Sequence, residues 1–250
     1  MRLEITTHIG CPMDCKDCPQ SLLKSVYKGK KTMDLEEYKQ VIDKLPKGRI
    51  DFSGMCEPFV NKHCADMILY AYEKGFPLAL YTTLQGATKA DYERLKHVRY
   101  EVCTIHLPDM DGRSHFNITD DYLELLSLWE CNAYSCHGVI DDRVKRYMKP
   151  RHVITYVHDR AGNIKERPHF NYPTGRLMCI TSGREMNHNV LLPNGEVITC
   201  CMDYGMTGRF GNLFEQSYEE VLNSEEAKRM RATLDDGESI CRHCTNAKRI

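Results

Sequence analysis

Net charge and long hydrophobic runs are nearly absent from this 250-residue sequence. Its 34 Lys and Arg residues offset 35 Asp and Glu residues, which leaves a formal net charge of -1. The densest basic stretch, Lys28-Gly29-Lys30-Lys31, is too short for a nucleic-acid footprint and indicates a solvated loop. No stretch reaches the roughly 20 apolar residues that a bilayer span needs, and no apolar signal region precedes the first predicted strand. The sequence therefore predicts a cytoplasmic protein that binds neither a membrane nor nucleic acid.

Cysteine, by contrast, is abundant, with 13 residues in the chain. An odd number of cysteines in a reducing compartment favours metal ligands and buried thiols over a secreted disulfide scaffold. Apolar residues make up 42% of the chain. A chain of this length and composition can bury one large core, or one core with a small appended domain.

Short apolar runs alternate with amphipathic helical stretches in the first part of the chain, which is typical of βα units around a parallel sheet. In the first such stretch, Leu35, Tyr38 and Val41 recur at helical spacing. Asp34 and Glu37 form a predicted capping box before them. Because a closed barrel of this type needs eight βα units, six units predict an open, partial (β/α)6 barrel within an α/β fold. The six strands are predicted at residues 3–7, 50–53, 78–82, 100–107, 133–139 and 153–157.

A second segment of different character follows, so we predict one domain over residues 1–165 and another over 166–250. Pro193-Asn194-Gly195 predicts a hairpin turn, and Ser217 with Glu220 predicts a helix cap. Because something must cover the open side of a partial barrel, we expect the second segment to do so.

Cys11, Cys15 and Cys18 follow the first predicted strand in C-x3-C-x2-C spacing. Three cysteines this close can ligate three irons of a [4Fe-4S] cube and leave the fourth iron open. A zinc knot or a set of buried thiols is the alternative. The motif resembles that of the radical S-adenosylmethionine (SAM) superfamily. The resemblance implies that SAM chelates the fourth iron and that one electron cleaves it to methionine and a 5'-deoxyadenosyl radical.

The loop after the second strand, Ser53-Gly54-Met55-Cys56-Glu57-Pro58, resembles the G-G-E-P segment that binds the SAM amino group in the same superfamily. Its position fits, because parallel α/β sheets bind ligands at the C-terminal ends of their strands. Two residues depart from the family pattern: Cys56 replaces a glycine, and Asp17 replaces an aromatic residue near the adenine. His137, in a segment with a loose likeness to the adenine-contacting one, is interpreted as a core or loop histidine. The resemblance implies SAM contacts from Ser53, Gly54, Met55, Cys56 and Glu57.

A second set of cysteines lies in the C-terminal segment. Cys179 precedes the predicted hairpin, Cys200 ends it, and Cys241 and Cys244 follow in C-x2-C spacing. This order resembles the auxiliary-cluster domain called SPASM, or twitch in its shortened form. The resemblance implies one auxiliary [4Fe-4S] cluster on these four cysteines, with Cys201 as an alternative to Cys200. A structural four-cysteine zinc site has the same ligand count and remains the other interpretation.

The length, both cysteine sets and the segment Arg160-Ala161-Gly162 resemble the twitch-domain dehydrogenases of 2-deoxy-scyllo-inosamine. The resemblance implies that the protein oxidises an alcohol on a sugar or cyclitol by two electrons. Arg160 is the predicted catalytic contact to the substrate, with a bridge between the two domains as the alternative role. The auxiliary cluster is the predicted electron acceptor. The predicted electron donor is a flavodoxin or ferredoxin.

Three other functions remain open at this point. A radical epimerase would use a thiol as hydrogen donor, for which Cys56 and Cys136 stand at predicted strand ends. A peptide maturase is a further alternative, although we identify no N-terminal domain that would bind a leader peptide. A non-catalytic metal-binding module would leave the Glu57 segment without a role.

Overall fold

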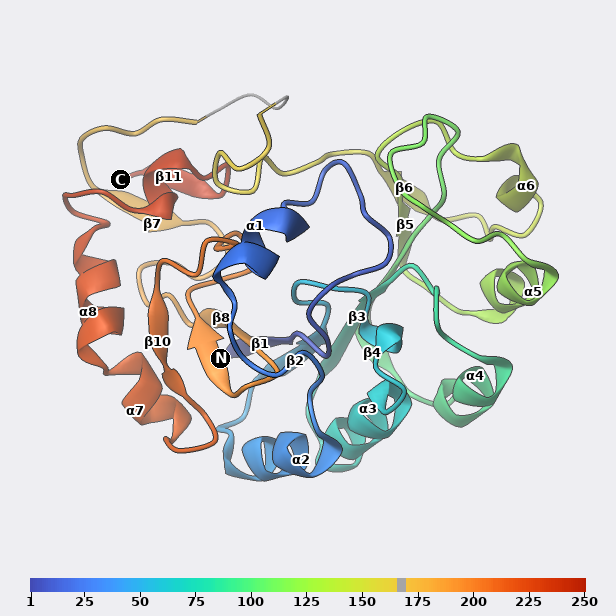
Figure 1. Ribbon diagram of the computed structural model, residues 1–250, viewed down its shortest axis with the longest axis horizontal. Coiled ribbons are helices and arrows are strands. Elements are labelled where there is room, and N and C mark those ends of the chain that lie inside the picture. Colours follow the sequence, from blue (N-terminus) through green and yellow to red (C-terminus); the bar gives the residue numbers. More distant parts are fainter. Residues whose placement is uncertain (166–169) are drawn as a thin grey trace.

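The computed structural model describes residues 1–165 and 170–250 (Figure 1). All six predicted strands are present, they follow one another in chain order across the sheet, and they are mutually parallel. Most are shorter than predicted, because pairing stops where the chain turns into the loops that carry the candidate site. The strands are β1 (Arg2–Ile5), β2 (Arg49–Phe52), β3 (Leu78–Thr82), β4 (Tyr100–His106), β5 (Ala133–Ser135) and β6 (His152–Ile154).

The sheet continues beyond β1 into the C-terminal segment. β8 (His188–Leu191) pairs in parallel with β1, and β9 (Glu196–Ile198) and β10 (Arg209–Asn212) follow in antiparallel orientation. The nine strands have the order β10-β9-β8-β1-β2-β3-β4-β5-β6. The predicted hairpin is confirmed between β8 and β9, where Gly195 has a φ of +85° that favours glycine. The division into two domains stays a prediction, but strands from both sides of it share one sheet.

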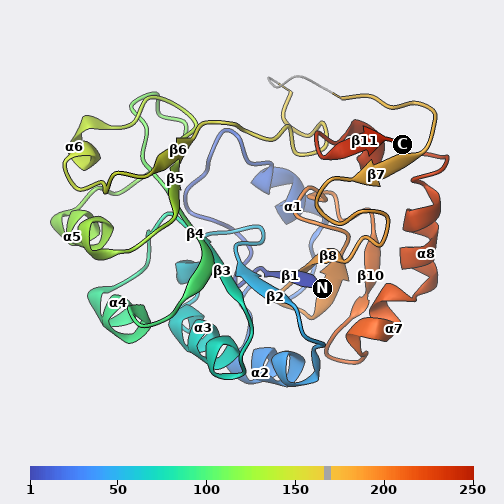
Figure 2. The ribbon, with the colours of Figure 1, turned by 180° about the vertical axis from the view of Figure 1, so that it is seen from behind.

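Most helices of the first part lie on the convex side of the curved sheet, and Figure 2 shows the same layer from behind. In α2, Tyr38, Val41 and Ile42 are buried against the sheet, as their spacing predicts. Asp34 caps this helix, but Glu37 pairs with Lys30 and does not close the predicted capping box. The layer consists of α2 (Leu35–Lys44), α3 (Cys64–Glu73), α4 (Lys89–Leu95), α5 (Asp120–Leu128) and α6 (Asp142–Lys145).

The concave side is covered by α1 (Gln20–Val26) and the loops around it (Figure 1). The remaining C-terminal elements lie at the β10 end of the sheet, where the predicted cap of Ser217 and Glu220 is confirmed as a capping box. Among the described residues, no helix is both long and apolar enough to cross a bilayer. The other short elements are η1 (Pro58–Val60), β7 (Leu177–Cys179), α7 (Tyr218–Leu222), α8 (Glu225–Ala232), η2 (Ile240–His243) and β11 (Ala247–Arg249).

Candidate active site

The concave face of the sheet is polar because of strand register. Side chains alternate between the two faces of a strand. Leu3 therefore enters the hydrophobic core beneath the helices, whereas Arg2 and Glu4 face the concave side. Parallel pairing aligns Glu4 with Asp51 of β2 and Arg2 with His188 of β8. Charged side chains from three adjacent strands thus gather on one face of the sheet.

Cys11, Cys15 and Cys18 line one cavity of about 230 Å³ at the C-terminal ends of these strands. None of the three forms a disulfide. Burial, followed by the charges of the neighbouring thiols of Cys18 and Cys11, raises the pKa of Cys15 to about 12. Tyr204, from the C-terminal segment, places its hydroxyl 3.3 Å from the Cys18 sulfur. Three unbonded thiols around one cavity are a donor set that fits three irons of a cubane cluster.

Asp17, where the superfamily usually has an aromatic residue, holds a loop in place. Arg113 donates hydrogen bonds of 2.8 and 2.7 Å to its two carboxylate oxygens. His137 Nδ1 lies 3.6 Å from Asp17, and its ring centroid lies 4.5 Å from that of His106. Burial, followed by the charge of His137, lowers the pKa of His106 to about 4. Both histidines line the cavity, and His137 lies in a loop beside Asp17, so its interpretation as a loop histidine stays a prediction.

The loop after β2 lies against the end of β1. Gly54 has a φ of +55°, and a Cβ at this position would collide with the Thr6 hydroxyl. The Met55 amide donates to the same hydroxyl at 3.1 Å, and the Gln20 side chain donates to the Met55 carbonyl. Ser53 lies outside the cysteine cavity. The loop residues that line it are Gly54, Met55, Cys56 and Glu57.

The Glu57 carboxylate is fully engaged within the chain. One oxygen accepts from the Thr82 hydroxyl at 2.6 Å and the Phe59 amide at 3.2 Å. The other accepts from the Thr83 hydroxyl at 2.7 Å and the Thr83 amide at 2.5 Å. A carboxylate has about four acceptor sites, so a bond from the SAM ammonium would have to displace one of these donors. In the structure, Glu57 joins the loop after β2 to the loop after β3.

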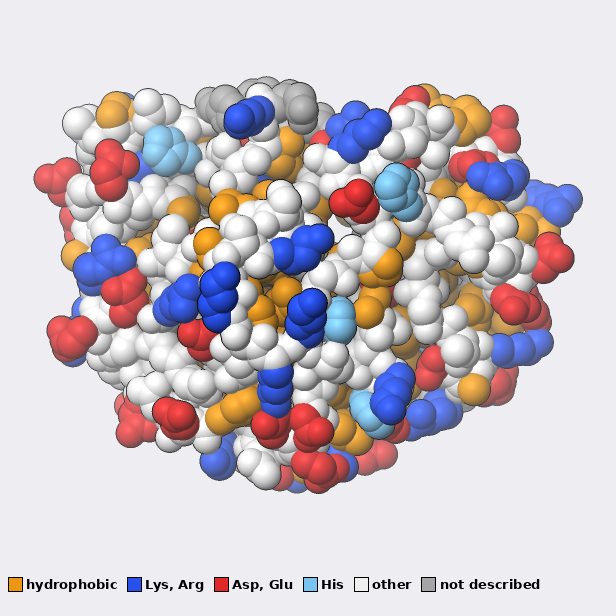
Figure 3. Space-filling view, in the orientation of Figure 1, with side chains coloured by type: hydrophobic (Ala, Val, Ile, Leu, Met, Phe, Trp, Pro, Cys, Tyr) orange, Lys and Arg blue, Asp and Glu red, His pale blue; other side chains and the backbone are white. Residues whose placement is uncertain are grey.

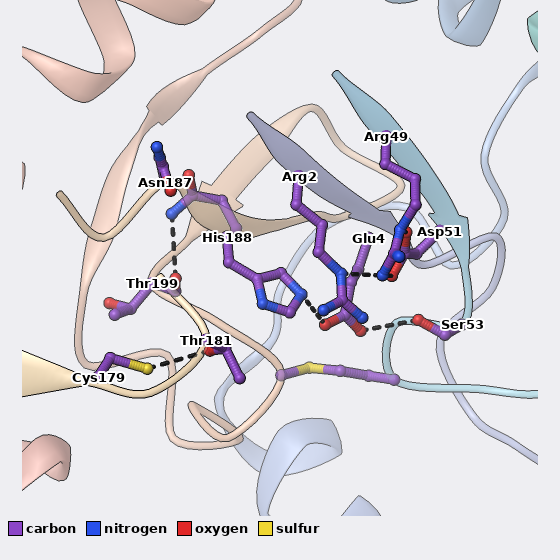
Figure 4. Close-up of polar contacts among 12 residues, drawn as sticks. Arg2, Glu4, Arg49, Asp51, Ser53, Cys179, Thr181, Asn187, His188 and Thr199 are labelled. Carbon is purple, nitrogen blue, oxygen red and sulfur yellow. Dashed lines mark hydrogen bonds and ion pairs between the residues drawn. The ribbon is translucent and has the colours of Figure 1, made fainter. Parts of the chain in front are cut away.

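A second cavity, of about 360 Å³, adjoins the first. It also adjoins the pocket lined by the second cysteine set. Most of its lining residues are polar or charged, and they include Ser53, whose hydroxyl donates to Glu4 at 2.7 Å (Figure 4). Residues shared with the first cavity are Gly54, Cys56, Tyr81 and Arg160. Residues shared with the second cysteine pocket are Thr181, His188, Cys201, Met202 and Asn246.

Arg160 stands in the wall between the two cavities. It follows β6 in a left-handed backbone conformation, with a φ of +53°. The centre of its guanidinium lies 5.9 Å from the ring centroid of Tyr204. Its Nε atom is buried, and it finds no hydrogen-bond partner among the described residues. This arginine therefore has donors available for a bound molecule, as its predicted role requires.

The second cysteine set converges in one pocket, which contains Cys179, Cys200, Cys241 and Cys244. The antiparallel pairing of β7 with β11 places Cys179 opposite Ala247, close to Cys244 in the chain. Burial, followed by the charges of Cys244 and Cys179, raises the pKa of Cys241 to about 12. No disulfide joins these residues.

Cys200 and Cys201 have different surroundings. Burial, followed by the charges of Cys201, Cys241 and Cys244, raises the pKa of Cys200. For Cys201, the charges that act after burial belong to Glu4 and Arg160. Both residues line the pocket of the second cysteine set, but of the two only Cys201 also lines the second cavity. Over the described ranges, no three His, Cys, Asp or Glu side chains are already arranged around a single metal ion.

Glu4, His188 and Gln20 also belong to this site, but the sequence alone did not predict them as site residues. Glu4 and His188 belong to strands from opposite ends of the chain, which only the sheet brings together. A carboxylate within an otherwise apolar strand was the one available signal for Glu4. Gln20 begins α1 directly after the cysteine motif, and nothing in its neighbourhood marks it as a contact to the loop after β2.

Comparisons with known proteins bear on both parts of the chain. Residues 179–245 match the SPASM family, described as an iron-sulfur cluster-binding domain. The structure of BtrN in complex with AdoMet and 2-DOIA superposes with a TM-score of 0.67 at 17% identity, over 98% of this chain and 92% of BtrN. The chain therefore shares the fold of BtrN, and residues 179–245 match the SPASM domain.

Two further solved structures share this fold. That of anSMEcpe with bound AdoMet has a TM-score of 0.60 at 13% identity, over 98% of this chain and 83% of anSMEcpe. Streptococcus suis SuiB bound to the precursor peptide SuiA has a TM-score of 0.59 at 12% identity, over 97% of this chain and 69% of SuiB. No curated protein sequence matches the chain.

Proposed function

We propose that this radical SAM protein oxidises an alcohol group of a small polar molecule, of the sugar or cyclitol type, to a ketone. The observation that carries the proposal is the position of the cavity of about 360 Å³, which shares walls with both cysteine-lined pockets. A molecule in this cavity lies between the site of a radical source and the site of an electron acceptor. Oxidation of an alcohol by hydrogen-atom removal needs both.

Two [4Fe-4S] clusters and SAM fit the residues present. Cys11, Cys15 and Cys18 would hold the first cluster, with SAM in the adjoining cavity against the loop after β2. Cys179, Cys200, Cys241 and Cys244 would hold the second cluster. When bound, the clusters and SAM supply a hydrogen-abstracting adenosyl radical and a one-electron acceptor.

The protein's own residues position the reactants. Glu57 fixes the loop after β2 through Thr82, the last residue of β3, and Thr83, which follows it, and these bonds shape the SAM cavity. Arg160 presents donors where the SAM cavity meets the second cavity, so it can orient a substrate hydroxyl. The predicted catalytic role of Arg160 rests on this placement.

The substrate class follows from the size and lining of the second cavity. Its volume of about 360 Å³ is at the low end of the usual range for small-molecule sites, and most of its lining is polar or charged. These properties suit a single polyhydroxylated ring. Among the similar folds, the BtrN structure contains 2-DOIA, whereas the SuiB and anSMEcpe structures contain peptides.

The test is anaerobic reconstitution with iron, sulfide, SAM and a low-potential reductant. A panel of 2-DOIA, myo-inositol and glucose, each deuterated at the ring carbons, serves as probe. We expect deuterium in 5'-deoxyadenosine and a ketone product that has lost one deuterium and one hydroxyl hydrogen relative to the deuterated alcohol. The triple variant Cys11→Ala/Cys15→Ala/Cys18→Ala should make neither. SAM cleavage by that variant, or turnover without ketone formation, would contradict the proposal.

Epimerisation is the second candidate, because Cys56 lines both cavities. Burial raises the pKa of Cys56 to about 12, although the hydrogen bond with Thr7 lowers it in part. Cys56 therefore keeps its S–H hydrogen at neutral pH. Cys136, the other thiol considered, lines neither cavity. An epimerase would leave the product mass unchanged in ordinary water and introduce one deuterium at carbon in deuterium oxide. Loss of that label in Cys56→Ala would favour the epimerase over the dehydrogenase.

A further inference from the structure

A buried carboxylate–imidazole pair lies in the wall of the second cavity. His188 Nε2 is 2.7 Å from one carboxylate oxygen of Glu4 (Figure 4). The Ser53 hydroxyl donates to the other oxygen at 2.7 Å. Glu4 is 4% exposed and His188 6%, so both are almost completely removed from water.

Strand pairing places the two residues together. β1 and β8 are neighbours, with Arg2 in register with His188 and Glu4 in register with Val190. Glu4 and His188 thus occupy the same face, two positions apart on adjacent parallel strands. Burying the Glu4 carboxylate costs several kcal/mol in desolvation, which its polar partners offset only in part. The pair is therefore a poor stabilising device compared with apolar residues of similar volume.

The second ring nitrogen of His188 is available. Nε2 is directed at Glu4, and across the described part of the chain no hydrogen bond involves Nδ1. The ring lies in the wall of the second cavity. Figure 4 shows the ring extending from β8 towards Glu4, with its other edge turned away from that carboxylate. An imidazole with Nε2 at this distance from a carboxylate can carry its N–H on that side and keep a lone pair on Nδ1.

Resting on the proposed function, we propose that His188, oriented by Glu4, is the base that takes the hydroxyl proton from the substrate alcohol. The carbinol hydrogen atom goes to the adenosyl radical and forms 5'-deoxyadenosine. The hydroxyl proton goes to His188 Nδ1, one electron goes to the iron-sulfur cluster of the second cysteine set, and the carbon–oxygen bond becomes a ketone. Glu4 stabilises the imidazolium that results.

The charge state of Glu4 agrees with this role. Burial alone would raise the pKa of Glu4, but His188 and Ser53 lower it to about 2. The carboxylate is therefore available at neutral pH to stabilise a protonated ring. Loss of the hydroxyl proton makes a substrate radical a stronger reductant, so a base at this point assists electron transfer to the neighbouring pocket.

Other polar groups of the cavity are less suited to accept a proton. Arg2 is held by Asp51 at 2.6 Å and, like Arg160, stays protonated. Burial raises the pKa of the Tyr81 phenol, so it stays neutral. His158 also lines the cavity, but its Nδ1 lies 3.2 Å from the Thr245 hydroxyl. His188 is the cavity histidine that has a carboxylate partner within the described residues.

The experiment compares His188→Gln and Glu4→Gln with His158→Gln, a matched histidine of the same cavity. Each variant is reconstituted as the full chain, checked for about eight irons at four per cluster, and given the ring-deuterated panel of 2-DOIA, myo-inositol and glucose. The readout is the ratio of ketone formed to deuterium transferred into 5'-deoxyadenosine. We expect His188→Gln to lower this ratio by roughly a hundredfold or more, within the range for loss of a general base. His158→Gln should keep the wild-type ratio whatever its rate.

Glu4→Gln should also lower the ratio of ketone to transferred deuterium, but by a smaller factor. If His188→Gln fails to bind its clusters, the ratio in Glu4→Gln tests the role of the pair instead. A wild-type ratio in His188→Gln, or an equal loss in His158→Gln, would overturn the role of His188 and leave alcohol oxidation standing. If wild-type protein makes no ketone from any member of the panel, the proposed function is wrong, and so is the proposed role of His188 as the base. The two failures are distinguished by the wild-type reaction alone.

Discussion

Cys200 and Cys201 are adjacent in the chain and turn to different partners. The charges of Cys241 and Cys244 act on the pKa of Cys200, whereas those of Glu4 and Arg160 act on the pKa of Cys201. From the sequence, either residue could be the cluster ligand, because both stand at the end of the predicted hairpin. The polarity of the surroundings separates them.

We therefore expect Cys200→Ser to lose about four irons, one cluster's complement, and Cys201→Ser to retain them. Iron and sulfide analysis after anaerobic reconstitution measures the difference. The paired variants control for general effects of a serine at this turn. Equal iron loss in both variants would mean that the cluster can use either sulfur.

At the loop after β2, Glu57→Gln should weaken SAM binding through the loop, since it replaces one acceptor oxygen by a donor facing threonine hydroxyl or amide donors. Leaving a buried polar group unsatisfied costs about 1–3 kcal/mol, or roughly 5- to 150-fold in affinity if the loop carries the cost. Equilibrium dialysis with iron-loaded protein measures it. Ser53→Ala, outside the SAM cavity, is the control, and unchanged affinity in Glu57→Gln would reject this role for the loop.

Site residues were predictable from the sequence where their signal is local. The two cysteine sets and the Gly54–Glu57 segment have characteristic spacing, so the sequence predicted their grouping. Glu4 and His188 have no spacing of their own, because their proximity arises from the pairing of β1 with β8. Glu57 was recognised but its contacts were not, since they depend on the conformation of the loop after β3.

Among the elements, α1 was not predicted, although it starts two residues after Cys18. Its seven residues give too short a pattern to distinguish from a loop. In Figure 3, Lys and Arg side chains gather over the middle of the face where α1 lies. Lys24 and Lys28, in α1 and just beyond it, are exposed. We propose that an acidic electron donor, such as a flavodoxin, docks here.

Reversing charge on this element tests that proposal. Lys24→Glu/Lys28→Glu should slow SAM cleavage supported by reduced flavodoxin by roughly tenfold or more at low salt, because opposite charges steer association. Cleavage supported by dithionite should be unchanged. Lys145→Glu/Lys228→Glu, on helices away from α1, is the charge-matched control. An equal effect in both pairs would show that only net charge matters.

At the scale of the whole molecule, the parallel sheet and its helices were predictable because alternating βα patterns extend over many residues. The continuation through β8 was not predictable. The sequence of a hairpin strand does not indicate which strand pairs with its other edge, and here that strand is β1. Residues expected to cover the open side of the barrel instead complete the sheet next to β1. The predicted boundary at residue 165 therefore separates the two cysteine sets, but it does not separate two sheets, because one sheet contains strands from both sides.

This arrangement predicts the behaviour of a fragment of residues 1–165. Without β8, the fragment exposes the backbone of β1 and leaves Glu4 without His188, so we expect it to self-associate. Size-exclusion chromatography and circular dichroism, with the full chain at the same concentration as control, measure the outcome. A monomeric fragment with the full chain's thermal stability would show that residues 1–165 form an independent domain.

The pairing of β1 with β8 also has a consequence on the ribosome. Ile5 is synthesised about 186 residues before its partner Leu191 (191 − 5). At roughly 5–20 residues per second, the first strand waits on the order of ten to forty seconds for its neighbour. During that time its free edge is open to other nascent chains, so the yield of native protein in a cell should depend on chaperones that bind early and release late.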